Sequence, residues 1–186
     1  MACGACTVAA AVLSLAAPAT NLYQSSAYGC ISSWGYRKHC YGQDYYCLTR
    51  DCSQGFYCTR NRTNLNAIGA LLILSALSAT VAAVGTIVIL FKGRLPWRLA
   101  VAATATFVGI LTTFLAFTIQ IVTFFNSQCG AIATGEFSLH AEGWQLSTAL
   151  GLSLASFALL GAAAFTLLTL CTEKSDDDES PVVPLS

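Results

Sequence analysis

The chain has 186 residues, of which 55% are hydrophobic and only 10% are charged, and its formal net charge is zero. Because the surface of a soluble domain carries about 25–35% charged residues, this composition excludes an ordinary soluble protein. A neutral chain also offers no basic surface to a nucleic acid. The composition therefore predicts an integral membrane protein that has the lipid bilayer as a partner and binds no nucleic acid.

The first 36 residues contain no Lys, Arg, Asp or Glu, and residues 7–19 are apolar or small. One interpretation is a first transmembrane helix over residues 1–22, which just reaches the ~20 residues that span a bilayer. The alternative is a cleaved signal peptide, for which Ala17–Pro18–Ala19 offers an A-x-A-like site. Cleaved signals usually begin with a basic region, and this stretch has none, so we expect a retained span.

Residues 23–66 form a long polar loop between apolar stretches. Aromatic runs interrupted by turn-forming residues at 42–44 and 53–55 predict short antiparallel strands. So small a segment buries little core, so we expect disulfides to stabilise it. Its aromatic side chains are too many to be buried completely, which predicts a binding face that includes Tyr45 and Tyr46. The nine aromatic residues are Tyr23, Tyr28, Trp34, Tyr36, Tyr41, Tyr45, Tyr46, Phe56 and Tyr57.

The centre of this loop is the segment 30–40, in which two cysteines bracket an aromatic–glycine pair and a short basic run. A hairpin with a disulfide between Cys30 and Cys40 fits the spacing, and Gly35 is expected to form the turn with a positive φ. Trp34 either covers the bridge or lies at the membrane–water boundary. A zinc site is disfavoured because this segment has no CxxC pair and His39 is its only imidazole.

Three further apolar stretches, at 67–91, 99–125 and 144–171, contain no charge and exceed the length of a membrane helix. Small residues four apart predict close helix packing, although the same residues are also common on lipid-facing surfaces. Gln120 is a strongly polar side chain in the interior of a span, and it is interpreted as a hydrogen-bonding contact between helices or, alternatively, as part of a polar path. The small residues are Ser75, Ala79 and Ala83; Ala105, Gly109 and Thr113; and Ser147, Gly151 and Ala155.

The short basic connection 92–98 predicts the orientation, because Lys and Arg concentrate on the cytoplasmic side. The loops 23–66 and 126–143 are then external, and both termini are internal. The acidic tail 172–186 is expected to be disordered. External cysteines are expected to be oxidised, with a connectivity that spacing alone does not decide beyond the favoured Cys30–Cys40 pair. The external cysteines are Cys30, Cys40, Cys47, Cys52, Cys58 and Cys129.

Few residues suggest chemistry. The two histidines, His39 and His140, lie in separate loops without ligands spaced for a metal, so no metal site, cofactor or enzymatic activity is predicted. Cys3, Cys6 and Cys171 lie near the inner face as free thiols or as sites of S-acylation. Asn61 begins a glycosylation sequon, but its closeness to the next span argues against modification.

The segment 30–40 resembles the signature of the amastins, four-span surface proteins of trypanosomatid parasites. A more distant likeness is to claudins, which carry a Trp–Gly–aromatic group and a cysteine pair on a four-span bundle. Ser33 and His39 depart from the amastin signature. The matching residues are Cys30, Ile31, Ser32, Trp34, Gly35, Arg37 and Cys40.

This resemblance implies an all-α membrane protein with four transmembrane helices and a small, disulfide-linked, β-rich extracellular domain of claudin-like architecture. It also implies a surface protein with a structural, adhesive or host-interaction role, in the plasma membrane or an endosomal or vacuolar membrane. The alternative is a subunit of an ion or proton channel or transporter, which the absence of ionisable residues in the spans disfavours. A protein partner or self-association through the external loops and small-residue helix faces is expected.

Overall fold

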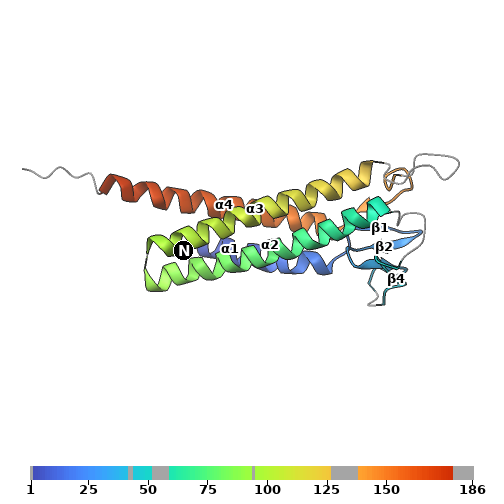
Figure 1. Cartoon of the computed structure of the whole chain (residues 1–186), viewed down its shortest axis with the longest axis horizontal. Helices are drawn as coiled ribbons and strands as arrows, with labels where there is room; N and C mark the ends of the chain where they lie inside the picture. The colour runs from blue at the N-terminus through green and yellow to red at the C-terminus, as the bar shows by residue number, and fades with distance from the viewer. Residues whose placement is uncertain (1, 42–43, 52–58, 94, 127–137, 178–186) are drawn as a thin grey trace, which may run out of the picture.

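The computed structural model describes residues 2–41, 44–51, 59–93, 95–126 and 138–177, with the backbone alone described at 2, 3, 59 and 170–177. It consists of a bundle of four helices with a small sheet at one end (Figure 1). The N-terminus and the connection between the second and third helices lie at the other end of the bundle. The two loops expected on the external side therefore share one end.

The helices follow one another up and down the bundle (Figure 1). Helices α1 and α3 each pack against both α2 and α4. The first helix ends in a short 3-10 turn, η1 (Ala17–Ala19), in which Pro18 occupies an early position. The helices are α1 (Ala2–Ala16), α2 (Thr59–Lys92), α3 (Pro96–Phe125) and α4 (Thr148–Asp177).

Three of the described helices contain segments that are long and apolar enough to cross a membrane: Arg60–Lys92, Pro96–Phe125 and Thr148–Thr169. The apolar segment Gly4–Ala19 is shorter. At a rise of about 1.5 Å per residue it extends about 24 Å, against about 30 Å for the hydrocarbon core of a bilayer. The expected four-span architecture is thus supported for three helices, and a crossing by α1 stays a prediction.

Two helix starts differ most from the expected spans. Helix α2 begins at Thr59 rather than at 67, because its polar first turns continue the helix beyond the apolar segment. Helix α4 begins at Thr148 rather than at 144, because residues 145–146 pair as a strand. The helix then runs to Asp177, so the first part of the tail expected to be disordered is helical. A helix grows one hydrogen bond at a time from an existing turn, which favours this extension.

The sheet is antiparallel and has five strands in the order β4-β3-β2-β1-β5. Its edge strand β5 comes from the segment just before α4, so the two loops are joined by backbone pairing. Tyr23 is the centre of this arrangement, because it pairs with Ile31 on one side and with Leu146 on the other. The strands are β1 (Tyr23–Ser25), β2 (Gly29–Ile31), β3 (Gly35–Arg37), β4 (Cys47–Leu48) and β5 (Gln145–Leu146).

Small side chains fill much of the bundle interior. The predicted small-residue rows on α2 and α3 are buried, and Gly109 lies so close to α4 that an added Cβ would be 3.2 Å from Leu160 Cδ1. The row on α4 does not pack within the bundle, because Gly151 and Ala155 are exposed, as the lipid-facing alternative allows. That helix buries a different face, because its sequence has small residues on more than one side and only the neighbouring helices select one. The buried small residues of α4 are Ala149, Ser153, Ser156 and Ala163.

Hydroxyl groups join the helices inside the bundle. Ser14 on α1 and Ser156 on α4 share a hydrogen bond of 2.6 Å, and Ser75 on α2 and Thr113 on α3 share one of 2.5 Å. All four side chains are buried. Such pairs satisfy polar groups that would otherwise face hydrocarbon without a partner.

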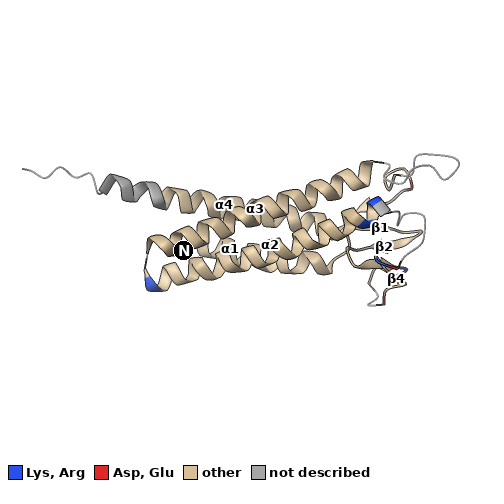
Figure 2. Ribbon diagram, viewed as in Figure 1, with Lys and Arg blue, Asp and Glu red and all other residues tan. Residues whose placement is uncertain are grey.

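The connection between α2 and α3 has the residues that such a turn requires. Gly93 has a φ of 81°, and its N–H donates to the carbonyl of Ile89, which ends α2 in a left-handed cap. Pro96 begins α3, where a missing N–H has no cost. Figure 2 shows that the basic colour marks this turn and that the other charged side chains that the structure describes gather at the sheet end, with uncharged helix between them.

Candidate functional site

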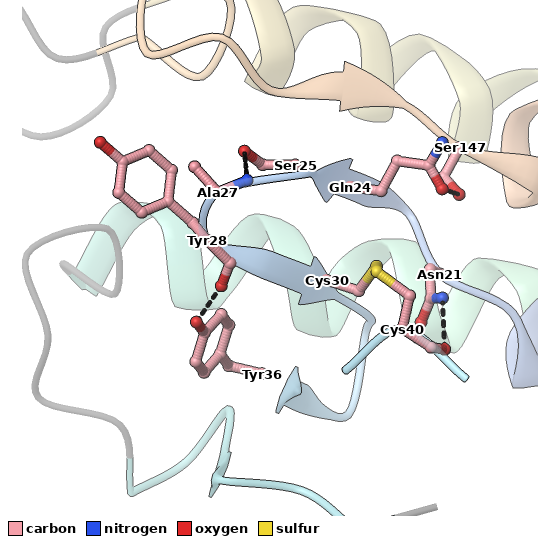
Figure 3. The surroundings of a disulfide bond; sticks show 9 residues. All are labelled: Asn21, Gln24, Ser25, Ala27, Tyr28, Cys30, Tyr36, Cys40 and Ser147. Carbon is pink, nitrogen blue, oxygen red and sulfur yellow. Dashed lines mark hydrogen bonds between the residues drawn. A yellow bond between two sulfur atoms is a disulfide. The ribbon is translucent and has the colours of Figure 1, made fainter. Parts of the chain in front are cut away.

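A disulfide between Cys30 and Cys40 closes the segment 30–40 at the sheet end of the bundle (Figure 3). The two Cα atoms are 5.1 Å apart. Cys30 lies in β2 opposite Arg37 of β3, and the carbonyl of Cys40 accepts a hydrogen bond of 3.2 Å from Asn21 Nδ2. The bridge and this bond attach the end of the segment both to the sheet and to the residues that follow α1.

The tight turn in this segment depends on Ser32, which is buried. Its Oγ accepts bonds of 3.2 Å from the N–H groups of both Trp34 and Gly35 and donates one of 3.1 Å to the carbonyl of Gly35. The expectation that Gly35 turns with a positive φ is wrong, because it lies in β3 and the positive φ of 103° belongs to Gly29. The side-chain bonds of Ser32 allow the turn to form without a positive φ at Gly35.

Gly35 is required for a different reason. A Cβ at this position would lie 2.3 Å from the carbonyl oxygen of Cys47 and 3.0 Å from the Cα of Leu48. The absence of a side chain therefore lets β4 approach β3. Two backbone bonds of 2.8 Å extend this pairing, from the N–H of Tyr46 to the carbonyl of Tyr36 and from the N–H of Thr49 to the carbonyl of Trp34.

Trp34 joins the segment to the end of the first helix. Its indole Nε1 donates a hydrogen bond of 2.7 Å to the carbonyl of Pro18 in η1, while the ring stays partly exposed. This arrangement fits the amphipathic position that Trp takes at a membrane–water boundary, which was one of the two alternatives for this residue.

Two cations lie over aromatic rings on the outer surface of the sheet. The guanidinium of Arg37 is 4.2 Å from the ring centre of Tyr45 and donates a bond of 2.5 Å to its hydroxyl, and Lys38 Nζ is 4.3 Å from the ring centre of Tyr46. Tyr41 is fully exposed, and Tyr46 is 56% exposed. We call these five residues the aromatic–cationic face.

A hollow of about 310 Å³ opens in this face, lined by Lys38, Tyr45 and Tyr46 with His39 and Asp44. Beside it, the hydroxyl of Tyr36 donates to the carbonyl of Tyr28 (Figure 3). Burial, with a smaller contribution from Tyr46, raises the pKa of Tyr36 above its usual range, which favours the protonated phenol that donates this bond.

Tyr23 does not belong to this face, although the sequence analysis counted it among the loop aromatics. It is fully buried, its ring stacks on Phe124 with the centres 6.1 Å apart, and its hydroxyl donates a bond of 2.9 Å to the carbonyl of Gln120. The Gln120 side chain in turn donates from Nε2 to the carbonyl of Leu22 at 3.1 Å. Gln120 therefore connects α3 to the start of β1, so it forms a structural contact, but with the segment after α1 rather than with the neighbouring helix that was expected.

The family model for the amastin surface glycoproteins matches residues 3–168. The chain belongs to the amastin family. Neither the comparison with curated proteins nor that with solved structures gives a match. The residues on which the resemblance in the segment 30–40 rested have structural roles in this amastin: the disulfide, the buried Ile31, the Ser32 turn, the close approach at Gly35 and the contact between Trp34 and Pro18.

The second loop of this amastin contributes to the same end. Trp144, which was expected to begin the fourth span, lies before β5 and stacks on Tyr28 with the ring centres 6.1 Å apart. Ser147 donates from its hydroxyl to the side chain of Gln24 at 3.1 Å (Figure 3). Its N–H donates to the carbonyl of Leu22 at 3.0 Å. A strand and these polar contacts therefore link the two loops.

The remaining predicted sites are the other cysteines, the glycosylation sequon and the residues considered for a metal. Cys47 is disulfide-bonded, and Cys6 is a free thiol. Asn61 is 2% exposed and lies in the first turn of α2. The part of the chain that the structure describes contains no group of three His, Cys, Asp or Glu side chains that could hold a metal. The predictions for Cys52, Cys58, Cys129, Phe56 and Tyr57 lie outside the described residues.

Proposed function

We propose that this amastin is a surface protein that adheres to a partner through the aromatic–cationic face. The observation that carries the proposal is the pairing of Arg37 with Tyr45 and of Lys38 with Tyr46. A cation stacked on a ring holds both side chains in position, so less conformational entropy is lost on binding. Tyr and Arg are also the residues enriched where protein surfaces meet.

The proposed orientation puts this face on the external side. The basic connection 92–98 is cytoplasmic, and α1 serves as the fourth span of the bundle, with both termini inside. The packing of α1 along α2 and α4 supports this role, since a helix in the bundle must cross most of the membrane with its neighbours. The membrane is the plasma membrane or an endosomal or vacuolar one.

The polar groups of the bundle support a structural role over ion conduction. Ser14 and Ser156, Ser75 and Thr113, and the Gln120 side chain all form hydrogen bonds between separate elements of the chain. These groups are thus used for packing within the protomer. An ion-flux assay on the chain reconstituted in liposomes distinguishes a structural role from ion conduction. An ion flux that depends on the chain would refute a purely structural role.

Attachment of cells tests the adhesive role directly. Cells that express the chain are added to monolayers that express it and to monolayers that do not, and the bound cells are counted. The double variant Tyr45→Ala and Tyr46→Ala should lower attachment at least several-fold, since an aromatic contact at the centre of an interface is worth about 2 kcal/mol. Phe91→Ala, an exposed aromatic at the opposite end of α2, is the matched control.

The two monolayers also identify the type of partner. Attachment only to monolayers that express the chain indicates self-association, and attachment to both indicates a different partner. If the double variant attaches as well as the unaltered chain while reaching the surface in equal amounts, the face is not the contact site. The rings would then serve only to place the sheet at the lipid headgroups.

A further inference from the structure

An apolar groove runs along the outer surface of α2 and α3, between the connection that joins them and the middle of the bundle. It consists of two adjoining hollows of about 300 Å³ and 470 Å³, which share Val81 and Val101. Its lining on α3 extends from Trp97 to Val108. At about 1.5 Å per residue, this is a length of roughly 17 Å, close to the depth of one leaflet of a ~30 Å hydrocarbon core.

The end of the groove at the connection is basic. Arg98 lines it, and one terminal nitrogen of its guanidinium donates to the carbonyls of Lys92 and Gly93 at 2.9 Å and 3.3 Å. Its Nε is buried and has no hydrogen-bond partner among the described residues. Lys92, whose carbonyl accepts one of these bonds, is exposed. The Cζ of Arg98 lies over the ring of Trp97, 5.4 Å from its centre. Arg98 is half-buried and Lys92 is exposed, so together they give this end of the groove a positive charge that an anion would complement.

We infer that the groove binds one acyl chain of an anionic phospholipid of the cytoplasmic leaflet, with the lipid phosphate at Arg98 and Lys92. The apolar lining matches the acyl chain in character, and its length matches one leaflet. The cationic end matches the phosphate in charge. The acidic side chains that the structure describes, Asp44, Asp51 and Glu142, belong to the sheet end, so none of them competes at this site.

The two basic side chains favour an anionic lipid over a zwitterionic one. A zwitterionic headgroup brings a positive charge toward Arg98 and Lys92, whereas an anionic headgroup does not. The cytoplasmic leaflet is also the one that carries anionic lipids and attracts basic residues near the membrane surface. Trp97, which is exposed beside the groove, lies at the depth where amphipathic rings are usually found.

Native mass spectrometry of the full chain tests the inference. The chain is extracted from nanodiscs of equal parts phosphatidylglycerol and phosphatidylcholine, and the lipids that stay bound are counted. We expect retained phosphatidylglycerol to exceed phosphatidylcholine about tenfold. Arg98→Gln should reduce this ratio to near one, and Arg98→Lys should keep most of it, because Lys retains the charge. Arg60→Gln, at the sheet end of α2, is the matched control and should leave the ratio unchanged.

A second variant tests the groove independently of Arg98, which also caps α2. Val101→Phe places a large ring in the shared part of the groove and should lower retention of both lipids. Leu154→Phe, on the lipid-facing side of α4, is its control and should leave retention unchanged.

Three results would overturn the inference. The first is equal retention of the two lipids by the unaltered chain. The second is a dimer in the spectrum that Val101→Phe abolishes, because the occupant of the groove would then be a second copy. The third is phosphatidylglycerol preference that emerges only after removal of residues 173–186, because the acidic tail would then be the native partner of Arg98. None of these outcomes depends on the aromatic–cationic face.

Discussion

The substitution Gly35→Ala tests the central feature of the segment 30–40, which is the close approach of β4 to β3. An added Cβ would lie 2.3 Å from the carbonyl oxygen of Cys47, whereas real Cβ contacts below 3.0 Å are essentially never found. The nearest atoms are backbone, so no side chain can rotate away, and β4 must move by at least about 0.7 Å. Overpacking of this kind costs about 1–3 kcal/mol.

Hydrogen exchange measures this cost at the affected bonds. The N–H groups of Tyr46 and Thr49 donate across the β3–β4 pair at 2.8 Å, so their exchange reports the opening of β4. A loss of about 1–3 kcal/mol corresponds to exchange about 5- to 150-fold faster, since about 1.4 kcal/mol is a factor of ten. The experiment uses peptide-resolved exchange of the full chain in nanodiscs.

Gly151→Ala is the matched control, because an added Cβ there meets nothing within 4 Å. It should leave the exchange of Tyr46 and Thr49 unchanged. If Gly35→Ala changes their exchange by less than about twofold, β4 does not depend on the close approach. The requirement for glycine at this position would then have no explanation in the packing of the two strands.

Three further predictions concern the bundle, the sequon and the cysteines. In a double-mutant cycle with Ser75→Ala and Thr113→Val, we expect a coupling of about 0.6 kcal/mol in the free energy of unfolding, measured by denaturation in mixed micelles. We expect Asn61 to be unmodified, so an N-glycosidase should leave the mass of the chain unchanged, whereas a new sequon made by Tyr41→Asn and Gln43→Thr should be modified. In differential alkylation, Cys6 should react before reduction and the external cysteines only after it, namely Cys30, Cys40, Cys47, Cys52, Cys58 and Cys129.

Each of these has a result that would contradict it. A coupling of zero would mean that Ser75 and Thr113 do not bond across α2 and α3. A loss of mass that Asn61→Gln abolishes would show that the first turn of α2 opens to the transferase before it packs. Early alkylation of four or more external cysteines would refute the expected oxidation, and a bridge between Cys3 and Cys6 would contradict the proposed orientation.

The residues that carried the amastin resemblance and the residues of the proposed binding face are largely separate. Ile31, Ser32 and Gly35 build the segment 30–40, while the aromatic–cationic face lies mostly beyond them, at Tyr41, Tyr45 and Tyr46. Of the signature residues, Arg37 contributes to both. The scaffold can therefore stay the same while the exposed aromatic residues change, which fits loops that carry binding residues on a rigid base.

The sequence by itself determined the class of the protein and its local elements. Membrane helices are recognisable from a single chain because each satisfies its own backbone bonds within about 20 apolar residues. The segment 30–40 was recognisable for a similar reason, since its two cysteines, its turn and its basic residue are close in sequence. The family followed from those residues and the order of the spans.

Only the tertiary structure decided what depends on residues distant in the chain. It paired β5 with β1 and thereby moved the start of α4 to Thr148. It buried Tyr23 against Gln120, and it selected Ala149 and Ser153 rather than Gly151 as the packed face of α4. Propensity and periodicity act over a few residues, whereas these choices depend on which neighbour lies across the contact, and small residues on several faces of a helix leave that choice to packing.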